Sequence, residues 1–192
     1  MATTRGDRPM RADARRNYER LLTTASEAFR EHGLDTSLED IARGAGVGIG
    51  TLYRHFPDRF ALMEAVFEDQ IDRMGEEASR LTDDASQSPL QALRYWLRAY
   101  MEHAMEFRGM SSALLEEGRL ANCHLRLKTY AQTLTDRAHA SGELSPSANY
   151  LDILRIANAL AYATEKAAVK SPEDTDLSDR LLTLAFEGLR TR

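Results

Sequence analysis

The stretch TSLEDIARGAGVGIGTLYRHF, residues 36–56, decides how this chain folds. Thr36, followed three residues later by Glu39, forms a capping-box pattern that begins a helix, and apolar residues continue from there at helical spacing. Gly44 and Gly46 end that helix, because glycine adopts the left-handed backbone conformation of a sharp turn. A second short helix follows at once. The stretch therefore predicts a helix, a turn and a helix.

The second helix, from about Gly48 to Phe56, has one narrow apolar side formed by Leu52 and Phe56. A helix this short is not stable alone, so neighbouring elements must hold its apolar side and leave the rest exposed. No Asp or Glu occurs from Gly44 through Pro57. This pattern favours a helix that lies in a DNA groove, with a helical corner that only packs as the alternative. The candidate DNA-contacting residues are Ser37, Ile49, Gly50, Thr51, Tyr53, Arg54 and His55.

The same residues resemble the helix-turn-helix of the tetracycline-repressor (TetR) family. The usual family pattern is T-x-x-x-I-A-x-x-A-G-V-S-x-G-T-x-Y-x-H-F followed by a basic residue. Gly48 departs from it, because the family usually places a capping serine there; glycine as N-cap costs roughly a few tenths of a kcal/mol more. The resemblance implies that Arg59 contacts a DNA phosphate. The matching residues are Thr36, Ile41, Ala42, Ala45, Gly46, Val47, Gly50, Thr51, Tyr53, His55 and Phe56.

Composition limits the fold and the location of the protein. The chain has 192 residues, which is enough for one or two domains. Strong apolar periodicity and only five prolines predict an all-α fold of about nine helices. The single Cys123 excludes an internal disulfide framework. No apolar run approaches the roughly 20 residues needed to cross a bilayer, so we expect a cytoplasmic protein with no membrane partner.

Charge is distributed unevenly along the chain. The formal net charge is −5, but residues 1–60 hold ten arginines and nine acidic side chains. Six of those arginines lie in the first twenty positions, whereas residues 61–192 are net acidic. A basic segment on an acidic protein is compatible with a local DNA-binding face, although basic tails also occur in proteins that bind no nucleic acid.

The chain divides into three predicted segments. Residues 1–10 have no apolar period and are expected to form a disordered basic arm. Residues 11–57 contain a first helix and the helix-turn-helix, and together they form the expected DNA-binding domain. Residues 58–192 are expected to form a helical domain for ligand binding and dimerisation. It starts with a long helix that we expect to act as a lever between the two domains.

Aromatic and methionine side chains in the expected second domain are candidates for a ligand pocket. Such residues suit small-molecule sites, since methionine adapts its shape and the aromatic residues include several with polar tips. At helical spacing they are also ordinary core residues, and this alternative stays open. The candidates are Trp96, Tyr100, Met101, Met105, Phe107, Met110 and Tyr130.

The last two predicted helices, about residues 147–170 and 177–190, carry more apolar surface than one thin bundle needs to bury. Pairing with the same helices of a second copy would form a four-helix contact between identical surfaces. The resemblance implies dimerisation of this kind, and the alternative is that both helices complete the core of one subunit. The candidate interface residues are Leu154, Ala157, Leu160, Ala161, Leu181, Leu184, Ala185 and Gly188.

No catalytic or metal-binding pattern supports an enzyme. The chain contains no H-E-x-x-H motif, no Cys-His cluster and no phosphate-binding loop of the G-x-x-x-x-G-K-[ST] type. The glycines of residues 44–50 follow a helix, so they are not a dinucleotide fingerprint. We therefore expect no catalytic residues, no metal and no cofactor.

Together, the pattern and the resemblance predict a homodimeric, ligand-responsive transcriptional regulator. It would act as a repressor by binding a pseudo-palindromic double-stranded DNA operator, and a small-molecule effector of unknown identity would control it. The alternatives are an activator of the same family, a helical interaction module, or a helical-bundle enzyme with no role on DNA.

Overall fold

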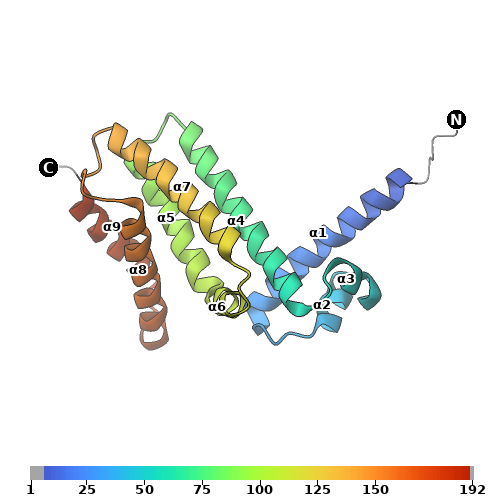
Figure 1. Cartoon of the computed structure of the whole chain (residues 1–192). Helices are drawn as coiled ribbons and strands as arrows, with labels where there is room; N and C mark the ends of the chain where they lie inside the picture. Colours follow the sequence, from blue (N-terminus) through green and yellow to red (C-terminus); the bar gives the residue numbers. More distant parts are fainter. Residues whose placement is uncertain (1–6, 191–192) are drawn as a thin grey trace, which may run out of the picture. The chain divides into compact units, whose positions relative to one another are not determined.

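The computed structural model describes the backbone of residues 7–190 and the side chains of residues 12–190 (Figure 1). Within this range the chain forms nine helices, and its only extended pairing is an isolated bridge between Leu144 and Arg190. The prediction of an all-α fold is confirmed. None of the described helices is long and apolar enough to pass through a bilayer. The helices are α1 (Asp7–His32), α2 (Leu38–Gly44), α3 (Ile49–His55), α4 (Arg59–Asp83), α5 (Pro89–Glu106), α6 (Arg108–Glu116), α7 (Ala121–Ala140), α8 (Tyr150–Lys170) and α9 (Leu177–Leu189).

The first helix begins earlier than predicted. Residues 1–6 of the expected disordered arm lie outside the described residues, but α1 starts at Asp7, so residues 7–10 are helical. Pro9 does not prevent this, because a proline in the first turn lacks only an amide hydrogen that would have no partner within the helix.

The chain folds into two compact units. The first unit comprises the chain up to Asp69 together with Gly109–Arg119, and the second comprises Gln70–Arg108 and the chain from Leu120 onward. The division therefore falls inside α4, whereas the sequence placed a boundary between residues 57 and 58, where the helix was expected to begin. Periodicity locates the start of a helix but not the point along it where its packing partners change.

The core of the first unit comes from the apolar faces of its short and long helices. Leu21 and Ala25 of α1, Leu52 of α3 and Leu62 of α4 are completely buried, and Ile41 of α2 is 1% exposed. The spacing of these residues follows the helical repeat, so each helix turns one apolar side inward. Burial of each large aliphatic side chain contributes about 1.5–3 kcal/mol. This shared core fixes α2 and α3 against α1 and α4.

In the second unit, α5 packs against α7, α8 and α9. It begins with the predicted capping box, in which Ser88 and Gln91 each bond the backbone amide of the other, and Pro89 occupies the first turn. The completely buried Trp96 donates its indole N–H to the carbonyl oxygen of Met74 on α4, at 3.0 Å. This bond satisfies a polar group that would be costly to leave unpaired in the core.

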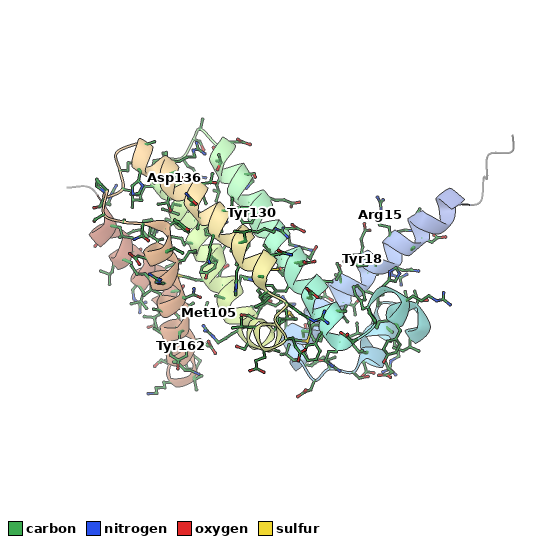
Figure 2. The ribbon with its side chains drawn as sticks, viewed as in Figure 1. Arg15, Tyr18, Met105, Tyr130, Asp136 and Tyr162 are labelled. Carbon is green, nitrogen blue, oxygen red and sulfur yellow. The ribbon has the colours of Figure 1, made fainter. Side chains whose placement is uncertain are left out.

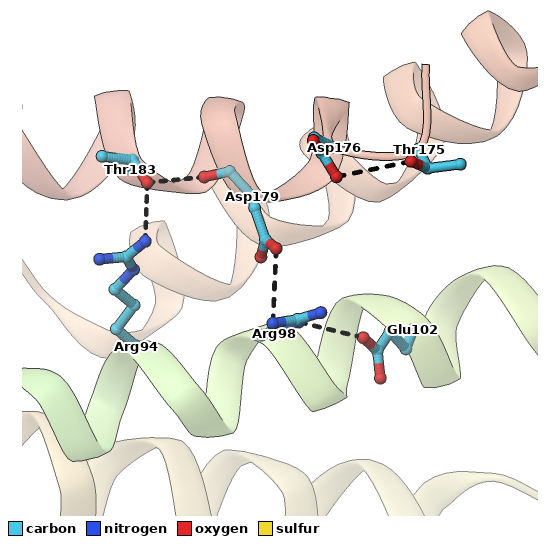
Figure 3. Close-up of polar contacts among 7 residues, drawn as sticks. All are labelled: Arg94, Arg98, Glu102, Thr175, Asp176, Asp179 and Thr183. Atoms are coloured by element: carbon cyan, nitrogen blue, oxygen red, sulfur yellow. Dashed lines mark hydrogen bonds and ion pairs between the residues drawn. The ribbon is translucent and has the colours of Figure 1, made fainter. Parts of the chain in front are cut away.

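Polar side chains hold α9 on α5 (Figure 3). Arg94 donates to the hydroxyl of Thr183 at 2.7 Å. Arg98 lies 3.4 Å from the carboxylate of Asp179 and 3.2 Å from that of Glu102. Phe186 and Leu182 are buried on the same side of α9, whereas Leu184 points away and is 64% exposed. One side of α9 therefore packs within its own subunit, and the opposite side is exposed.

Gly75 allows α4 and α7 to approach closely within the second unit. A Cβ atom at this position would lie 2.5 Å from the hydroxyl oxygen of Tyr130 and 2.6 Å from its Cζ. These distances are shorter than van der Waals contact, so any larger residue must displace the tyrosine.

We expect Gly75→Ala to lower the free energy of unfolding, because overpacking typically costs about 1–3 kcal/mol and outweighs the roughly 1 kcal/mol that alanine adds in a helix. In a Tyr130→Ala background the same change should raise the free energy of unfolding, since only the helix propensity remains. Urea unfolding of the four proteins measures both signs. Equal effects in the two backgrounds would contradict the close-packing explanation.

Candidate nucleic-acid interface

The cap of α2 lies one residue later than the sequence predicted. Ser37 is the N-cap: its hydroxyl accepts from the backbone N–H of Asp40 at 3.3 Å and donates to the carboxylate of Glu39 at 2.8 Å. The Ser37 bond lowers the pKa of Glu39. Thr36, predicted as the cap, instead donates its hydroxyl to the carbonyl oxygen of Gly33 at 2.8 Å. Gly33 has a φ of 79° and begins a turn. The Thr36 hydroxyl, which was expected to cap the helix, therefore stabilises this turn instead.

The turn between α2 and α3 forms at Gly46 as predicted, whereas Gly44 is still part of α2 and does not have a positive φ. Gly46 has a φ of 65°, and the backbone N–H of Val47 donates to the carbonyl oxygen of Ala42 at 3.0 Å. Gly48 is the N-cap of α3 in an extended conformation and has no side chain to bond the first turn. The carbonyl oxygen of Gly48 accepts from the N–H of Thr51 at 2.8 Å, which starts the helix.

The seven-residue α3 buries one side and exposes the other. Leu52 is completely buried and Phe56, which follows the helix, is 3% exposed. Tyr53 is 46% exposed. Gly50 and Arg54 are exposed, and Ile49 and Thr51 are half-buried at the edges of the same surface. Five of the predicted contact residues therefore lie on a surface that carries a cation, a phenol and a hydroxyl but no carboxylate.

An aromatic cluster braces α3 from behind. Tyr18 of α1, which Figure 2 shows on that helix, lies 5.2 Å from Phe56 and 5.8 Å from His55 between ring centroids. The His55 ring stands edge-on to Tyr18 and is half-buried. Burial, together with the nearby carboxylates of Glu68 and Asp69, raises the pKa of Tyr18. The ring of His55 packs in this cluster, and its predicted contact with DNA stays a prediction.

Arg59 is also engaged inside the first unit. Its guanidinium donates to the carbonyl oxygens of Leu34 and Thr36, the latter at 2.8 Å. These two carbonyls lie in the turn between α1 and α2, so Arg59 ties the start of α4 to that turn. Arg59 therefore has a structural role, and its contact with a DNA phosphate stays a prediction. The sequence could not show this, because the acceptors are backbone atoms more than twenty residues away.

Sequence reasoning missed Arg119, which neutralises acidic residues near the start of α4. Its guanidinium lies 2.6 Å from the carboxylate of Glu64 and 3.8 Å from that of Asp58. The hydrogen bond to Glu64 is the main cause of the raised pKa of Arg119. No local pattern connects positions 64 and 119, so only the folded chain reveals the pairing.

A shallow hollow of about 370 Å³ between α1 and the end of α2 was missed as well. It holds two arginines and two threonines, and Arg20 reaches the turn at Gly46, where any side chain would collide with its guanidinium. The spacing of Arg16, Arg20 and Thr23, one turn apart along α1, was a signal that sequence analysis could have used. The lining residues are Arg16, Glu19, Arg20, Thr23, Thr24, Gly44 and Ala45.

The predicted ligand-binding residues are mostly core residues. Trp96 stacks on Tyr100 with 5.8 Å between ring centroids, and the Tyr100 hydroxyl accepts from the side-chain amide of Asn158 at 2.6 Å. Tyr130 is half-buried against Gly75, and Met105 is also half-buried. Met110 belongs to the first unit, whereas the other six residues belong to the second. The remaining buried members are Met101, Phe107 and Met110.

The predicted dimer-interface residues divide between the interior and the surface. Leu154, Ala157 and Ala161 are 8%, 1% and 0% exposed, so they face the interior of their own subunit. For these three residues the prediction chose the wrong side of α8, because alanine and leucine occur on both. Leu184 is 64% exposed and Gly188 is also exposed. Leu160, Leu181 and Ala185 are half-buried.

Comparison with known proteins agrees with this geometry. Residues 21–66 match the model described as bacterial regulatory proteins, tetR family, and residues 88–191 match that of the SbtR-like transcriptional regulator C-terminal domain. An HTH-type transcriptional regulator of Staphylococcus aureus (strain MRSA252) is 36% identical over 90 residues, which are 45% of this chain and 47% of that protein. The chain thus spans about half the length of this relative, and 61% of a second regulator from that species (strain USA300).

Solved structures match over nearly the whole chain. A TetR transcriptional regulator from Streptomyces coelicolor is 33% identical, with a TM-score of 0.73 over 90% of this chain and 97% of that one. A TetR transcription regulatory protein from Mycobacterium vanbaalenii is 29% identical, with a TM-score of 0.74 over 95% of this chain and 100% of that one.

Replacing Arg59 with methionine tests its structural role. We expect Arg59→Met to lower the free energy of unfolding by about 1–3 kcal/mol, because two partly buried carbonyls lose a charged donor. Arg54→Met removes the same charge from the exposed side of α3 and should leave stability nearly unchanged. Thermal unfolding compares the two. If both variants unfold like the original protein, Arg59 does not hold the turn.

Proposed function

The chain belongs to the TetR family of bacterial transcriptional regulators, and on this premise we propose that it is a homodimeric repressor whose operator binding is released by a small-molecule effector. Membership of the family makes the chain a transcriptional regulator with a DNA-binding helix-turn-helix, not an enzyme. The identity of its DNA site, its assembly and its response to an effector form the proposal.

The exposed side of α3 is the observation that best supports DNA binding. The phosphate backbone repels carboxylates and dominates affinity, so a helix surface without carboxylates suits DNA binding. Tyr53 and Arg54 project from a helix whose other side is buried through Leu52. Arg54 suits bidentate contact with guanine or a phosphate, and Tyr53 can donate to a phosphate.

The remaining contacts follow from the same surface. Thr51 lies at its edge with Ile49, and the exposed Gly50 has open space around its Cα, so the backbone can approach base edges closely. Ser37 at the start of α2 is a weaker candidate, because its hydroxyl already caps the helix. In a dimer, two α3 helices would enter successive major grooves about 34 Å apart and read a pseudo-palindromic operator.

The outward sides of α8 and α9 support dimerisation. Ile156 and Tyr162 of α8 are 39% and 52% exposed, and Val169 is 81% exposed near the end of that helix. On α9, Leu184 lies opposite the side that is fixed to α5. Exposed apolar side chains on two adjacent helices suit an isologous contact with the same helices of a second copy.

The continuity of α4 supports coupling between an effector and the operator. This helix begins in the first unit at Arg59, continues through Asp69 and ends in the second unit at Asp83. A ligand bound in the second unit lowers DNA affinity only if it binds more tightly to a conformation that spaces the two α3 helices incorrectly. The role as a repressor rests on the family alone.

Selection of bound sequences from a random DNA pool tests the DNA-binding proposal and returns the half-site spacing. Arg54→Ala should weaken binding to the selected site by about tenfold or more and reduce the salt dependence. Arg80→Ala is the matched control: it removes the same charge from an exposed position in the second unit and should bind like the original protein. The proposal would be ruled out if the selection recovered no DNA sequence at low salt. It would also be ruled out if Arg54→Ala and Arg80→Ala weakened DNA binding equally.

Leu184→Glu tests the dimer contact. A carboxylate placed at the centre of an apolar contact between subunits is costly to bury, so the variant should be a monomer at micromolar concentration. Leu125→Glu on α7 is the control, since Leu125 is 65% exposed and Leu184 is 64% exposed. Light scattering after size exclusion measures both masses. A dimeric Leu184→Glu variant would place the contact elsewhere.

A further inference from the structure

The second unit contains a pocket that the sequence did not predict, between the first turns of α5 and the last turns of α9. Its volume is about 240 Å³. Sites for drug-sized ligands span roughly 300–1,000 Å³, so this pocket suits a smaller molecule. None of the predicted ligand-binding residues lines it. The lining residues are Ser88, Leu90, Gln91, Arg94, Glu143, Thr183, Phe186, Glu187 and Arg190.

The pocket has an apolar floor between polar walls. Leu90 and Phe186 line it and are only 5% and 6% exposed, so they form its deep part. Arg94 is half-buried on α5, and Glu187 is exposed on α9. A ligand held here therefore contacts apolar carbon atoms on one side and charged groups on the other.

One of the two carboxylates that line the pocket is already occupied. Glu143 accepts from the Ser88 hydroxyl, which is the main cause of its lowered pKa, and from the backbone N–H of Leu90. It also accepts from the Ser141 hydroxyl at 2.9 Å, and the charge of Arg190 lies near it. The Glu143 carboxylate thus completes the structure around the start of α5 and has little capacity left for a ligand.

The guanidinium of Arg94 and the carboxylate of Glu187 remain available. Arg94 reaches from α5 to α9 and donates to the hydroxyl of Thr183 at 2.7 Å (Figure 3). It forms no ion pair with any described residue, and four of its five donors remain. Glu187 has neither an ion pair nor a side-chain hydrogen bond within the described part of the chain.

The two available charges lie about one helical turn apart. Glu187 follows Thr183, the partner of Arg94, by four residues on α9, and residues at this spacing have Cβ atoms roughly 5–6 Å apart. A ligand with only a carboxylate would gain Arg94 but be repelled by Glu187, and a ligand with only an ammonium would meet the reverse. A molecule that carries both charges a few bonds apart matches both groups.

We propose that this pocket binds a small zwitterion of the amino-acid class. Its carboxylate accepts from Arg94, its ammonium donates to Glu187, and its apolar side chain contacts Leu90 and Phe186. That such a ligand is the effector rests on the proposed function, whereas its binding does not.

Three probes with the same carbon skeleton separate the two charges: L-leucine, 4-methylpentanoate, which lacks the ammonium, and 3-methylbutylamine, which lacks the carboxylate. Calorimetric titration of the full-length protein should give saturable binding of leucine below about 10 mM. Leucine should bind at least about fivefold tighter than either of the other probes, because each of them loses one charged hydrogen bond.

Arg94→Met removes the group that binds the carboxylate, so it should weaken leucine binding at least about fivefold. It should leave 3-methylbutylamine bound at least as tightly as before, because the repelling cation is gone. Arg98→Met is the matched control: it removes the same charge from α5 one turn further along, outside the lining of this pocket, and should bind leucine unchanged.

Glu187→Gln changes the preference between probes without threatening the fold, since the Glu187 side chain bonds no described residue. In this variant 4-methylpentanoate should bind at least as tightly as leucine, because the repelling carboxylate has been removed.

The proposal is overturned if leucine does not bind, or if either of the other probes binds the original protein as tightly as leucine does. It is also overturned if Arg98→Met weakens leucine binding as much as Arg94→Met, or if Glu187→Gln still prefers leucine. Because these titrations contain no DNA, they can fail while operator selection succeeds, and the reverse.

Discussion

A helix of seven residues makes too few internal hydrogen bonds to persist alone, and this constraint governs the first unit. The surface of α3 exists only because Leu52 and Phe56 are buried and because Tyr18 packs against the ring of Phe56. Those contacts in turn need α1 and α4 to hold fixed positions. The long helices of this unit are therefore the support for a short one.

Arginines with structural roles fix that support. Arg59 joins the start of α4 to the turn before α2 through two backbone carbonyls, and Arg119 joins the end of the α6 segment to Glu64 and Asp58. A guanidinium suits both tasks, because its five donors lie in one plane and stay charged at any physiological pH. The arginines of this unit thus divide between structural positions such as Arg59 and Arg119 and exposed positions such as Arg43 and Arg54. Counts of arginine alone do not separate the two groups.

Periodicity and turn residues predicted the nine helices, the glycine turn and the capping box of α5, because these features depend on neighbours in sequence. Two assignments differ from the structure. Thr36 was assigned the cap that Ser37 provides, because two neighbouring hydroxyls were both able to cap α2 and local turn geometry chose between them. Leu154 was placed on the outer side of α8, whereas packing within its own subunit buries it.

The path of the chain has a consequence for how such regulators can be recombined. The segment Gly109–Arg119 belongs to the first unit although the residues on both sides of it belong to the second, so the backbone passes between the units three times. A single crossover between residues 64 and 119 of two relatives would separate Arg119 from Glu64. A chimera that keeps the first unit intact must therefore take two separated pieces of sequence, the chain up to Asp69 and Gly109–Arg119, from the same parent.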